Sequence, residues 1–173
     1  MSRIEELFSD LEAGVAALER VRAGLRRYKA SVLKAAVSGK LLNRKLENGS
    51  GDLPEGWQWT TVGEMTQKMQ YGTSEKANLD ESGIPVLRMG NIQDGGIDYS
   101  NLKYLPDNTK GIDGLLLEPE DLLFNRTNSA ELVGKTAVYK ENHPKATFAS
   151  YLIRVRLNPA MLSDFVSYCN YSA

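Results

Sequence analysis

The apolar positions at the start of the chain predict one long helix, from Ile4 to about Ser38. Apolar or small residues recur there in alternating steps of three and four, the repeat of about 3.5 residues that is typical of a coiled-coil seam. The seam positions are Ile4, Leu7, Leu11, Gly14, Leu18, Val21, Leu25, Tyr28, Val32 and Ala35. A helix of this length would span about 52 Å, so we expect it to project from a fold or to bridge two folds. All the seam residues except Gly14 and Ala35 are candidate contacts to a second helix.

The charges along this helix indicate how the second helix would lie. Five acidic residues occupy the first half, and six basic residues occupy the second half. A parallel pair of copies would place like charges together, whereas an antiparallel pair would place acid against base. Ser2 could cap the helix start, and Gly39 stands where a left-handed terminating residue is expected. The alternative is a core helix of a bundle, but the rest of the chain supplies no other long helix.

The remainder of the chain divides into a linker and a second unit. We predict a helix over 1–42, a polar, glycine-rich linker over 43–52 and a domain over 53–173 that ends before its fold is complete. Alternation and short apolar runs predict five strands in this domain and then an amphipathic helix. The strands are expected near 57–62, with Trp57 and Trp59 packed in the core or at an edge, and at 84–92, 122–127, 133–140 and 147–157; the helix is expected at 159–169.

The distribution of charge restricts which ligands the chain can bind. Residues 1–46 carry 10 basic and 5 acidic side chains, whereas the rest of the chain carries 11 basic and 17 acidic ones. Binding to nucleic acid regardless of sequence depends on neutralising phosphates, so an acidic domain disfavours it. A role in nucleic-acid recognition would therefore require a local basic face.

Several classes of site are disfavoured by residue content. The chain has one cysteine and one histidine, which excludes an internal disulfide and offers no zinc-binding cluster. No signal peptide and no apolar run long enough for a membrane is evident, so we expect a cytoplasmic location and no membrane partner. The chain also lacks a phosphate-binding glycine loop, a dinucleotide fingerprint and a Ser-His-Asp set, which disfavours catalysis.

The segment Asn125–Ser129 (NRTNS) is rich in groups that recognise base edges. Arginine can bond guanine through two hydrogen bonds, asparagine can bond adenine, and serine or threonine can bond either base or a phosphate. The alternative is a polar turn whose side chains satisfy their own backbone. Composition does not separate these two interpretations.

Several segments together resemble the specificity subunit of type I restriction-modification systems. They are Leu53–Trp59 (LPEGWQW), Pro85–Ile92 (PVLRMGNI), Asp121–Ser129 (DLLFNRTNS) and Glu131–Lys135 (ELVGK), while Leu33–Leu41 (LKAAVSGKL) resembles the end of that family's long spacer helix. They occur in the family's order and extend over nearly the whole chain.

This resemblance implies an α/β (α+β) target-recognition domain preceded by a long coiled-coil-forming helix. It also implies a non-catalytic role in sequence-specific recognition of double-stranded DNA, with each such domain reading half of a bipartite site. In that family two spacer helices pair antiparallel. Methyltransferase subunits bind S-adenosylmethionine and recruit the restriction subunit, so the specificity subunit needs no cofactor of its own. Since this chain has one such helix and one such domain, we expect either a fragment or a half-size subunit that pairs with a second copy.

The resemblance and the base-edge chemistry together define a set of candidate DNA contacts, with no catalytic or metal-binding residue. The candidates are Tyr71, Gly72, Thr73, Ser74, Lys76, Arg88, Asn91, Asn125, Arg126, Thr127, Asn128, Ser129 and Lys135, with Arg154 and Arg156 as weaker phosphate contacts. The competing hypothesis is a coiled-coil scaffold that binds only proteins. A stand-alone nuclease or methyltransferase is a third, which addition of metal or methyl donor would test.

Overall fold

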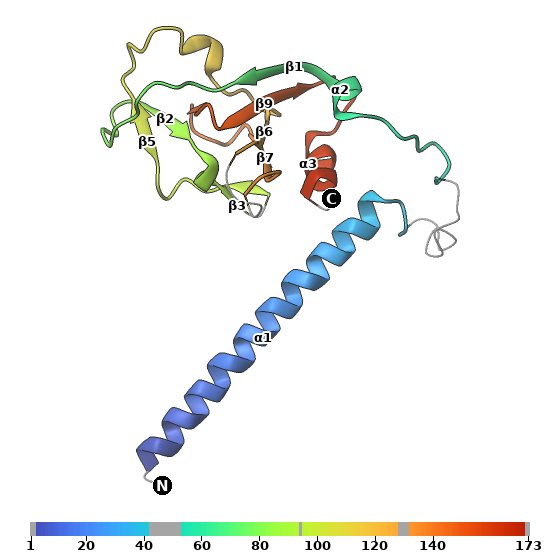
Figure 1. Ribbon diagram of the computed structural model, residues 1–173, viewed down its shortest axis with the longest axis vertical. Coiled ribbons are helices and arrows are strands. Elements are labelled where there is room, and N and C mark those ends of the chain that lie inside the picture. Colours follow the sequence, from blue (N-terminus) through green and yellow to red (C-terminus); the bar gives the residue numbers. More distant parts are fainter. Residues whose placement is uncertain (1–2, 42–52, 94, 128–131, 172–173) are drawn as a thin grey trace. The chain divides into compact units, whose positions relative to one another are not determined.

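The computed structural model describes residues 3–41, 53–93, 95–127 and 132–171. The chain divides into two compact units between Gly56 and Trp57: the first contains helix α1, and the second contains all the described strands (Figure 1). The predicted linker over 43–52 and the candidate contacts Asn128 and Ser129 lie outside the described residues.

Helix α1 (Arg3–Val37) confirms the predicted long helix. Its last turn closes through hydrogen bonds from Ser38 N to Lys34 O and from Gly39 N to Ala36 O, both 3.1 Å long. Gly39 has φ of 74°, the left-handed conformation that glycine adopts without steric cost. The helix therefore ends where its sequence predicts.

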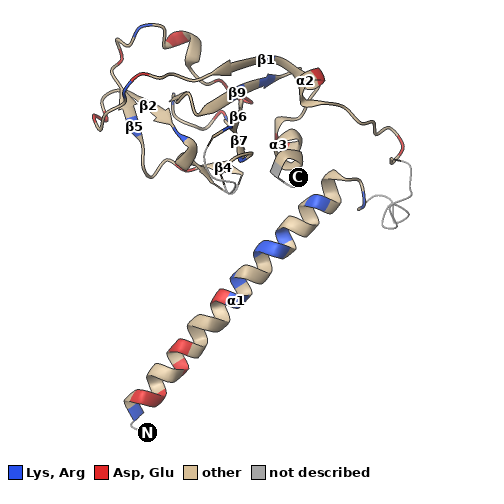
Figure 2. Ribbon diagram, viewed as in Figure 1, with Lys and Arg blue, Asp and Glu red and all other residues tan. Residues whose placement is uncertain are grey.

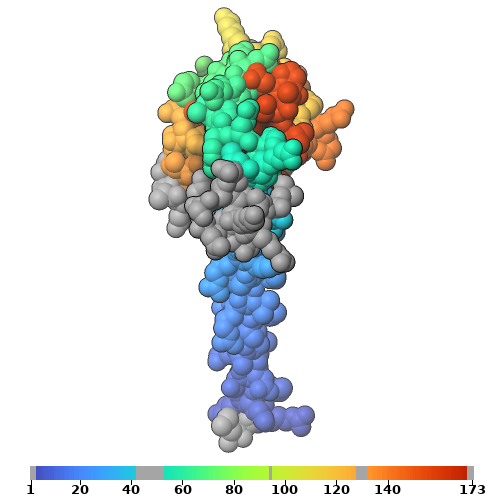
Figure 3. Space-filling view, turned by 90° about the vertical axis from the view of Figure 1, so that its right-hand side faces the viewer, coloured from blue at the N-terminus to red at the C-terminus, as the bar shows by residue number. Residues whose placement is uncertain are grey.

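The seam of α1 is exposed along the helix. The eight candidate pairing residues are between 38% and 71% exposed, and no residue of α1 is buried. Acidic residues concentrate toward its amino end and basic residues toward its carboxyl end (Figure 2). The space-filling view shows side chains standing out along α1, drawn in blue (Figure 3).

The second unit is built from three small sheets. The largest contains β1 (Thr66–Tyr71), β9 (Leu152–Leu157), β6 (Leu122–Asn125) and β7 (Thr136–Val138) in that order, with all neighbours antiparallel. The second contains β5 (Lys103–Leu105), β2 (Ile84–Leu87) and β8 (Thr147–Phe148); β2 pairs antiparallel with β5 and parallel with β8. The third is the hairpin of β3 (Ile92–Gln93) and β4 (Gly96–Ile97). The described helices of this unit are α2 (Val62–Met65), the 3-10 turns η2 (Met89–Asn91) and η3 (Asp113–Leu115), and α3 (Ser163–Tyr171).

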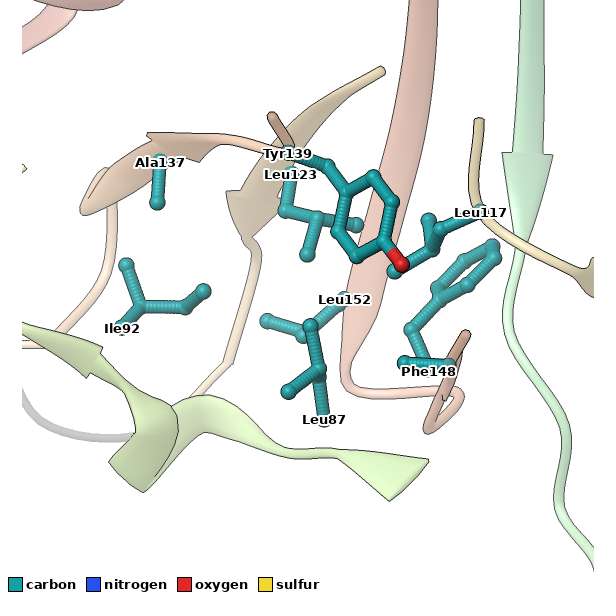
Figure 4. Close-up of a cluster of buried hydrophobic side chains, with 9 residues drawn as sticks. Leu87, Ile92, Leu117, Leu123, Ala137, Tyr139, Phe148 and Leu152 are labelled. Carbon is teal, nitrogen blue, oxygen red and sulfur yellow. The ribbon is translucent and has the colours of Figure 1, made fainter. Parts of the chain in front are cut away.

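The main core lies between the two larger sheets. Leu123 and Leu152 of the four-stranded sheet pack with Leu87 and Phe148 of the three-stranded sheet (Figure 4). Successive side chains of a strand point to opposite faces. The alternate residues therefore form a second cluster on the other face, where Val166 of α3 packs against it. Burial of apolar side chains on both faces, at about 25 cal/mol per Å² of apolar surface, stabilises this layered arrangement.

The predicted strand over 57–62 is wrong. Residues 57–61 form no strand, and the Thr61 hydroxyl caps α2 while the Glu64 carboxylate accepts from the Thr61 N–H (2.9 Å). This reciprocal cap satisfies helix-start donors locally and needs no strand partner. Trp59 is 85% exposed instead of buried, and Trp57 packs edge-on against Phe165 at 5.9 Å between ring centroids.

Other predicted elements are present but shorter. The strand expected over 147–157 is split into β8 and β9 by a turn, which Leu152 N closes onto Ala149 O at 2.9 Å. Only 84–87 of the 84–92 segment is in β2, because η2 follows Arg88. The strand near 122–127 is confirmed as β6, 133–140 is reduced to β7, and the last helix begins at Ser163.

Candidate nucleic-acid interface

Three segments carry most of the predicted DNA contacts, and they contain Thr73, Arg88 and Arg126. All three meet at one stretch of backbone. We call residues 148–151, which connect β8 to β9, the junction segment. Its peptide groups bond to all three segments, because Phe148 pairs in parallel with Leu87, Ala149 forms a parallel bridge with Thr73, and Tyr151 accepts from Arg126. The hydrogen bonds run from Thr73 N to Phe148 O (2.9 Å), Ala149 N to Leu87 O (2.9 Å), Ser150 N to Thr73 O (2.9 Å) and Arg126 N to Tyr151 O (3.3 Å).

Gly72 permits this close approach. A Cβ added at Gly72 would lie 2.2 Å from Phe148 O and 2.4 Å from Ala149 O, far inside van der Waals contact. Only glycine lets the chain pass so near another backbone. Gly72 therefore has a structural reason to be present, independent of DNA.

The junction segment forms one wall of a hollow of about 760 Å³. The predicted residues that line it are Thr73, Ser74, Lys76 and Arg88. Asn101, Lys103 and Tyr151 also line it, although sequence reasoning missed them. Lys103 reaches the hollow because it pairs with Val86 across β5 and β2. No local motif around Lys103 signals this long-range pairing.

The lining of the hollow is basic, unlike the remainder of the domain. Its charged residues are Lys76, Arg88 and Lys103 against one acid, Glu75. Arg126 adds a fourth cation beside the hollow, where its Nε donates to Ser150 O at 3.3 Å. The structure thus contains the local basic face that a nucleic-acid role would require of an acidic domain.

Arg88 and Asn91 support the wall of this hollow. Arg88 Nη2 donates to Asn101 O (2.8 Å), and its buried Nε has no partner among the described residues. Asn91 is 3% exposed; its Oδ1 accepts from Arg88 N (2.9 Å) and its Nδ2 donates to Asp98 O (2.8 Å). The expectation that Asn91 faces a ligand is therefore corrected, since its amide groups are occupied inside the domain.

Arg126 and Tyr71 form an exposed pair at one end of the four-stranded sheet. The guanidinium carbon of Arg126 lies 4.9 Å from the centre of the Tyr71 ring, and Tyr71 is 61% exposed. The strands bring them together because β1 and β6 flank β9 antiparallel on its two sides. A cation over an aromatic ring at an exposed site is stabilised by about 0.5–1 kcal/mol.

Asn125 is an internal support rather than a contact. It is 0% exposed, and its Nδ2 donates to Leu132 O (2.8 Å) and Thr127 O (3.2 Å). The Thr127 N–H and hydroxyl both lie within 3.5 Å of Asn125 Oδ1. At Asn125, therefore, the side chain bonds the backbone of its own turn, as in the alternative interpretation of this segment. Lys135 is half-buried, and the structure gives its side chain no ion pair within the described residues.

The interpretation of Arg154 and Arg156 as phosphate contacts is wrong. Arg154 is 2% exposed, its Nη1 donates to Leu116 O (2.6 Å), and it lies 3.6 Å from Asp121 Oδ2. Arg156 Nε donates to Asp121 Oδ1 (2.7 Å), and its Nη2 pairs with Glu118 Oε1 at 2.8 Å. Burial lowers the pKa of Arg154, whereas hydrogen bonding to Asp121 raises the pKa of Arg156. Both arginines are committed to holding the 114–121 segment against β9.

The described part of the chain gives no indication of a metal centre. No group of three or more His, Cys, Asp and Glu side chains is placed to hold an ion within the described ranges. The imidazole of His143 instead accepts from Lys140 N (3.1 Å) through Nδ1 and packs edge-on between the rings of Tyr99 and Tyr139. Among the described helices, none is both long and apolar enough to cross a membrane.

Three curated relatives of the chain are type I restriction enzyme specificity subunits. The chain is 29% identical over 168 residues to the type I restriction enzyme StySPI specificity subunit of Salmonella potsdam, covering 96% of this chain and 36% of that protein. It is 26% identical over 168 residues to the EcoKI specificity subunit of Escherichia coli, covering 95% and 35%. A putative MjaX specificity subunit of Methanocaldococcus jannaschii is 33% identical over 91 residues, 52% of this chain and 21% of that one. The chain thus spans about a third of the length of the first two relatives. No family model matches it.

Solved structures show the same fold. The HsdS subunit from Thermoanaerobacter tengcongensis matches 98% of this chain and 40% of its own, with a TM-score of 0.55 and 19% identity. A chain from a structure of a type I R-M system matches 99% of this chain and 42% of its own, with a TM-score of 0.54 and 18% identity. The curated relatives confirm the resemblance inferred from sequence motifs, and the solved structures confirm the predicted fold class, a long helix followed by a mixed helix and sheet domain.

Proposed function

We propose that this chain, which resembles type I restriction specificity subunits in sequence and fold, recognises a DNA sequence without catalysing a reaction itself. In this proposal the second unit reads one half of a bipartite site in double-stranded DNA. Methylation would be carried out by partner methyltransferase subunits that hold S-adenosylmethionine, and cleavage by a restriction subunit. The proteins would act together on DNA in the cytoplasm.

The observation that carries this proposal is the basic hollow. Three segments that were candidates on sequence grounds meet around the junction segment and place Lys76, Arg88 and Arg126 on and beside the hollow, and β5 adds Lys103. Phosphate contacts supply affinity, whereas side chains that reach base edges supply specificity. A scaffold that binds only proteins gives no reason for four cations to gather in an acidic domain.

Helix α1 would set the position of the recognition domain along the duplex. Its exposed seam and its division into an acidic and a basic half favour antiparallel pairing with a second copy or with another spacer helix. A helix of 35 residues is about 52 Å long, which exceeds one turn of DNA at ~34 Å. Such a pair can therefore hold two recognition domains over separate half-sites.

The alternative function is a coiled-coil scaffold that contacts proteins but not DNA. The exposed seam of α1 is compatible with both functions, because the seam requires a helical partner in either case. Dependence on salt distinguishes the two functions, since log affinity for duplex DNA falls with log salt concentration by about 0.9 for each phosphate neutralised.

The test uses the chain assembled with its methyltransferase subunits. Affinity for a duplex carrying the target site is measured by fluorescence anisotropy at several salt concentrations, for the wild type and for the double variant Lys76→Ala/Lys103→Ala. If both lysines contact phosphates, the slope of log affinity against log salt falls in magnitude by about 2. The control is Lys110→Ala, which removes an exposed lysine that does not line the hollow.

An equal slope for the double variant and the wild type would contradict the assignment of the hollow. An assembled complex that binds every duplex equally at every salt concentration would contradict sequence recognition itself. If the isolated chain methylated DNA when given S-adenosylmethionine, or cleaved it when given Mg²⁺, the non-catalytic part of the proposal would fail.

The role of the seam is tested by sedimentation. Leu25→Glu places a charge in the predicted helix pair, whereas Ala23→Glu places the same charge on the opposite side of α1. Since burying a leucine contributes about 1.5–3 kcal/mol, the seam variant should weaken association at least tenfold. Equal association of both variants would exclude pairing through this seam.

A further inference from the structure

The side chain of Arg126 is held in place although its end is exposed. The guanidinium carbon lies over the Tyr71 ring at 4.9 Å from its centre, and Nε donates to Ser150 O at 3.3 Å. Its backbone N–H donates to Tyr151 O, which ties the residue to the junction segment. Arginine ordinarily loses much rotamer freedom when it binds a ligand, and these contacts remove part of that freedom beforehand.

The terminal nitrogens of Arg126 have no partner within the part of the chain that the structure describes. Among the described residues, the structure gives no hydrogen bond and no ion pair to Nη1 or Nη2. The two contacts that order the side chain thus use Nε and the ring face, and leave the end of the fork open. An end-on arginine fork with two parallel N–H donors is the geometry that matches the O6 and N7 acceptors of guanine in the major groove.

The surroundings of the fork favour a base over a phosphate. Tyr71 is 61% exposed, so exposed aromatic surface lies against the guanidinium. A phosphate contact needs only positive charge, which the flexible lysines 76 and 103 supply at the hollow. Reading a base requires a fixed direction, and a ring and a carbonyl that orient the fork provide it.

We infer that Arg126 is a specificity-determining residue that reads one guanine of the recognised half-site, and that Tyr71 is a positioning residue that orients it. This inference rests on the proposed function and deepens it, because it assigns a base identity to one contact. The half-site read by this chain accordingly contains a G·C pair, and its discrimination at that pair depends on an aromatic ring at position 71.

The experiment maps methylated sites in cells that express the chain with its methyltransferase subunits and that lack other adenine methylation. Sequencing that detects modified bases gives the recognised motif for the wild type and for Arg126→Ala, Arg126→Lys, Tyr71→Ala and Tyr71→Phe. Arg126→Ala and Arg126→Lys should accept other bases at one G·C position, with discrimination there falling roughly 5- to 150-fold, while the rest of the motif is retained. Arg126→Lys keeps the charge but loses the fork, so it separates base reading from phosphate binding.

The Tyr71 variants test orientation. Tyr71→Ala should relax the same G·C position by a smaller factor, and Tyr71→Phe should retain wild-type discrimination because it keeps the ring face. A role of Tyr71 in folding alone would instead lower methylation equally at every site. Lys110→Ala serves as the control variant and should leave the motif unchanged.

Three outcomes would overturn the inference. They are a wild-type half-site without a G·C pair, an unchanged motif for Arg126→Ala, and a loss of methylation in Arg126→Lys that is equal for all bases at the position. A wild-type complex that methylates without any sequence preference would contradict the proposed function instead, so the two failures are distinguishable.

Discussion

Gly72→Ala is the substitution that tests most directly how the interface is built. The added methyl carbon would lie 2.2 Å from Phe148 O and 2.4 Å from Ala149 O, and both oxygens belong to backbone that cannot rotate away. Either the 72–74 segment or the junction segment must move by about 1 Å to restore van der Waals contact near 3.4 Å. Such a shift breaks the pairing between Thr73 and its two partners.

The expected loss follows from the contacts that would break. The hydrogen bonds from Thr73 N to Phe148 O and from Ser150 N to Thr73 O, each 2.9 Å long, contribute about 0.5–1.5 kcal/mol apiece. Overpacking adds about 1–3 kcal/mol. The free energy of unfolding should therefore fall by about 2–6 kcal/mol, a large part of the ~5–15 kcal/mol that is typical of a domain.

The matched control is Gly90→Ala, because Gly90 lines the same hollow and has no atom within 4 Å of an added Cβ. This control should change stability by less than about 1 kcal/mol. Urea unfolding of both variants is followed by tryptophan fluorescence, since Trp57 packs on Phe165 and reports the second unit. Equal unfolding free energies for the two variants, within about 0.5 kcal/mol, would refute the close-approach explanation of Gly72.

Three further predictions concern buried polar groups. Asp121→Asn should lower the unfolding free energy by about 3–5 kcal/mol in urea titrations, because it leaves the buried Arg154 without its counter-charge. Glu118→Gln, at the exposed end of the same network, should lower it by less than about 1 kcal/mol. Equal losses in the two variants would contradict this prediction. Tyr99→Phe should raise the melting temperature, because the Tyr99 hydroxyl is buried without a partner among the described residues, and Tyr139→Phe should lower it, because that hydroxyl donates to the Pro144 carbonyl. Burial also raises the pKa of Tyr99 and of Tyr139 above the ordinary 10.0. The unfolded state therefore ionises first, so stability should hold below about pH 10 and fall above it, and the fall should be less steep in Tyr99→Phe. A melting temperature that does not change with pH up to about pH 11 would contradict this prediction.

Elements whose stability is local were predictable from sequence. Helix α1 was predicted nearly to the residue, because its 3-4 repeat is long and Gly39 marks its end through a backbone preference of a single residue. Strand β6 was located by its short apolar run, and the segment that contains β8 and β9 was located by its alternation of apolar and polar residues. At Trp59 the alternation was misleading, since the local cap between Thr61 and Glu64 took precedence over strand pairing.

The candidate site was predictable in its segments but not in its individual side chains. Sequence chemistry named Tyr71, Lys76, Arg88 and Arg126, which the structure brings to one end of the domain or into one hollow. The same chemistry named Asn125, whose amide instead bonds the turn that follows β6. A polar side chain looks the same in sequence whether it faces a ligand or its own backbone.

What the sequence determined by itself was the helix with its seam and charge polarity, and the positions of several strands of the domain. These depend on residue spacing and composition, which are properties of the chain itself. The tertiary structure decided which cations are free to contact a ligand. Strand pairing turned Arg154 and Arg156 toward Asp121 and brought Lys103 beside Val86, while the junction segment placed Arg126 over Tyr71. Those outcomes depend on contacts between residues far apart in the chain, because burial and pairing are set only when the sheets assemble.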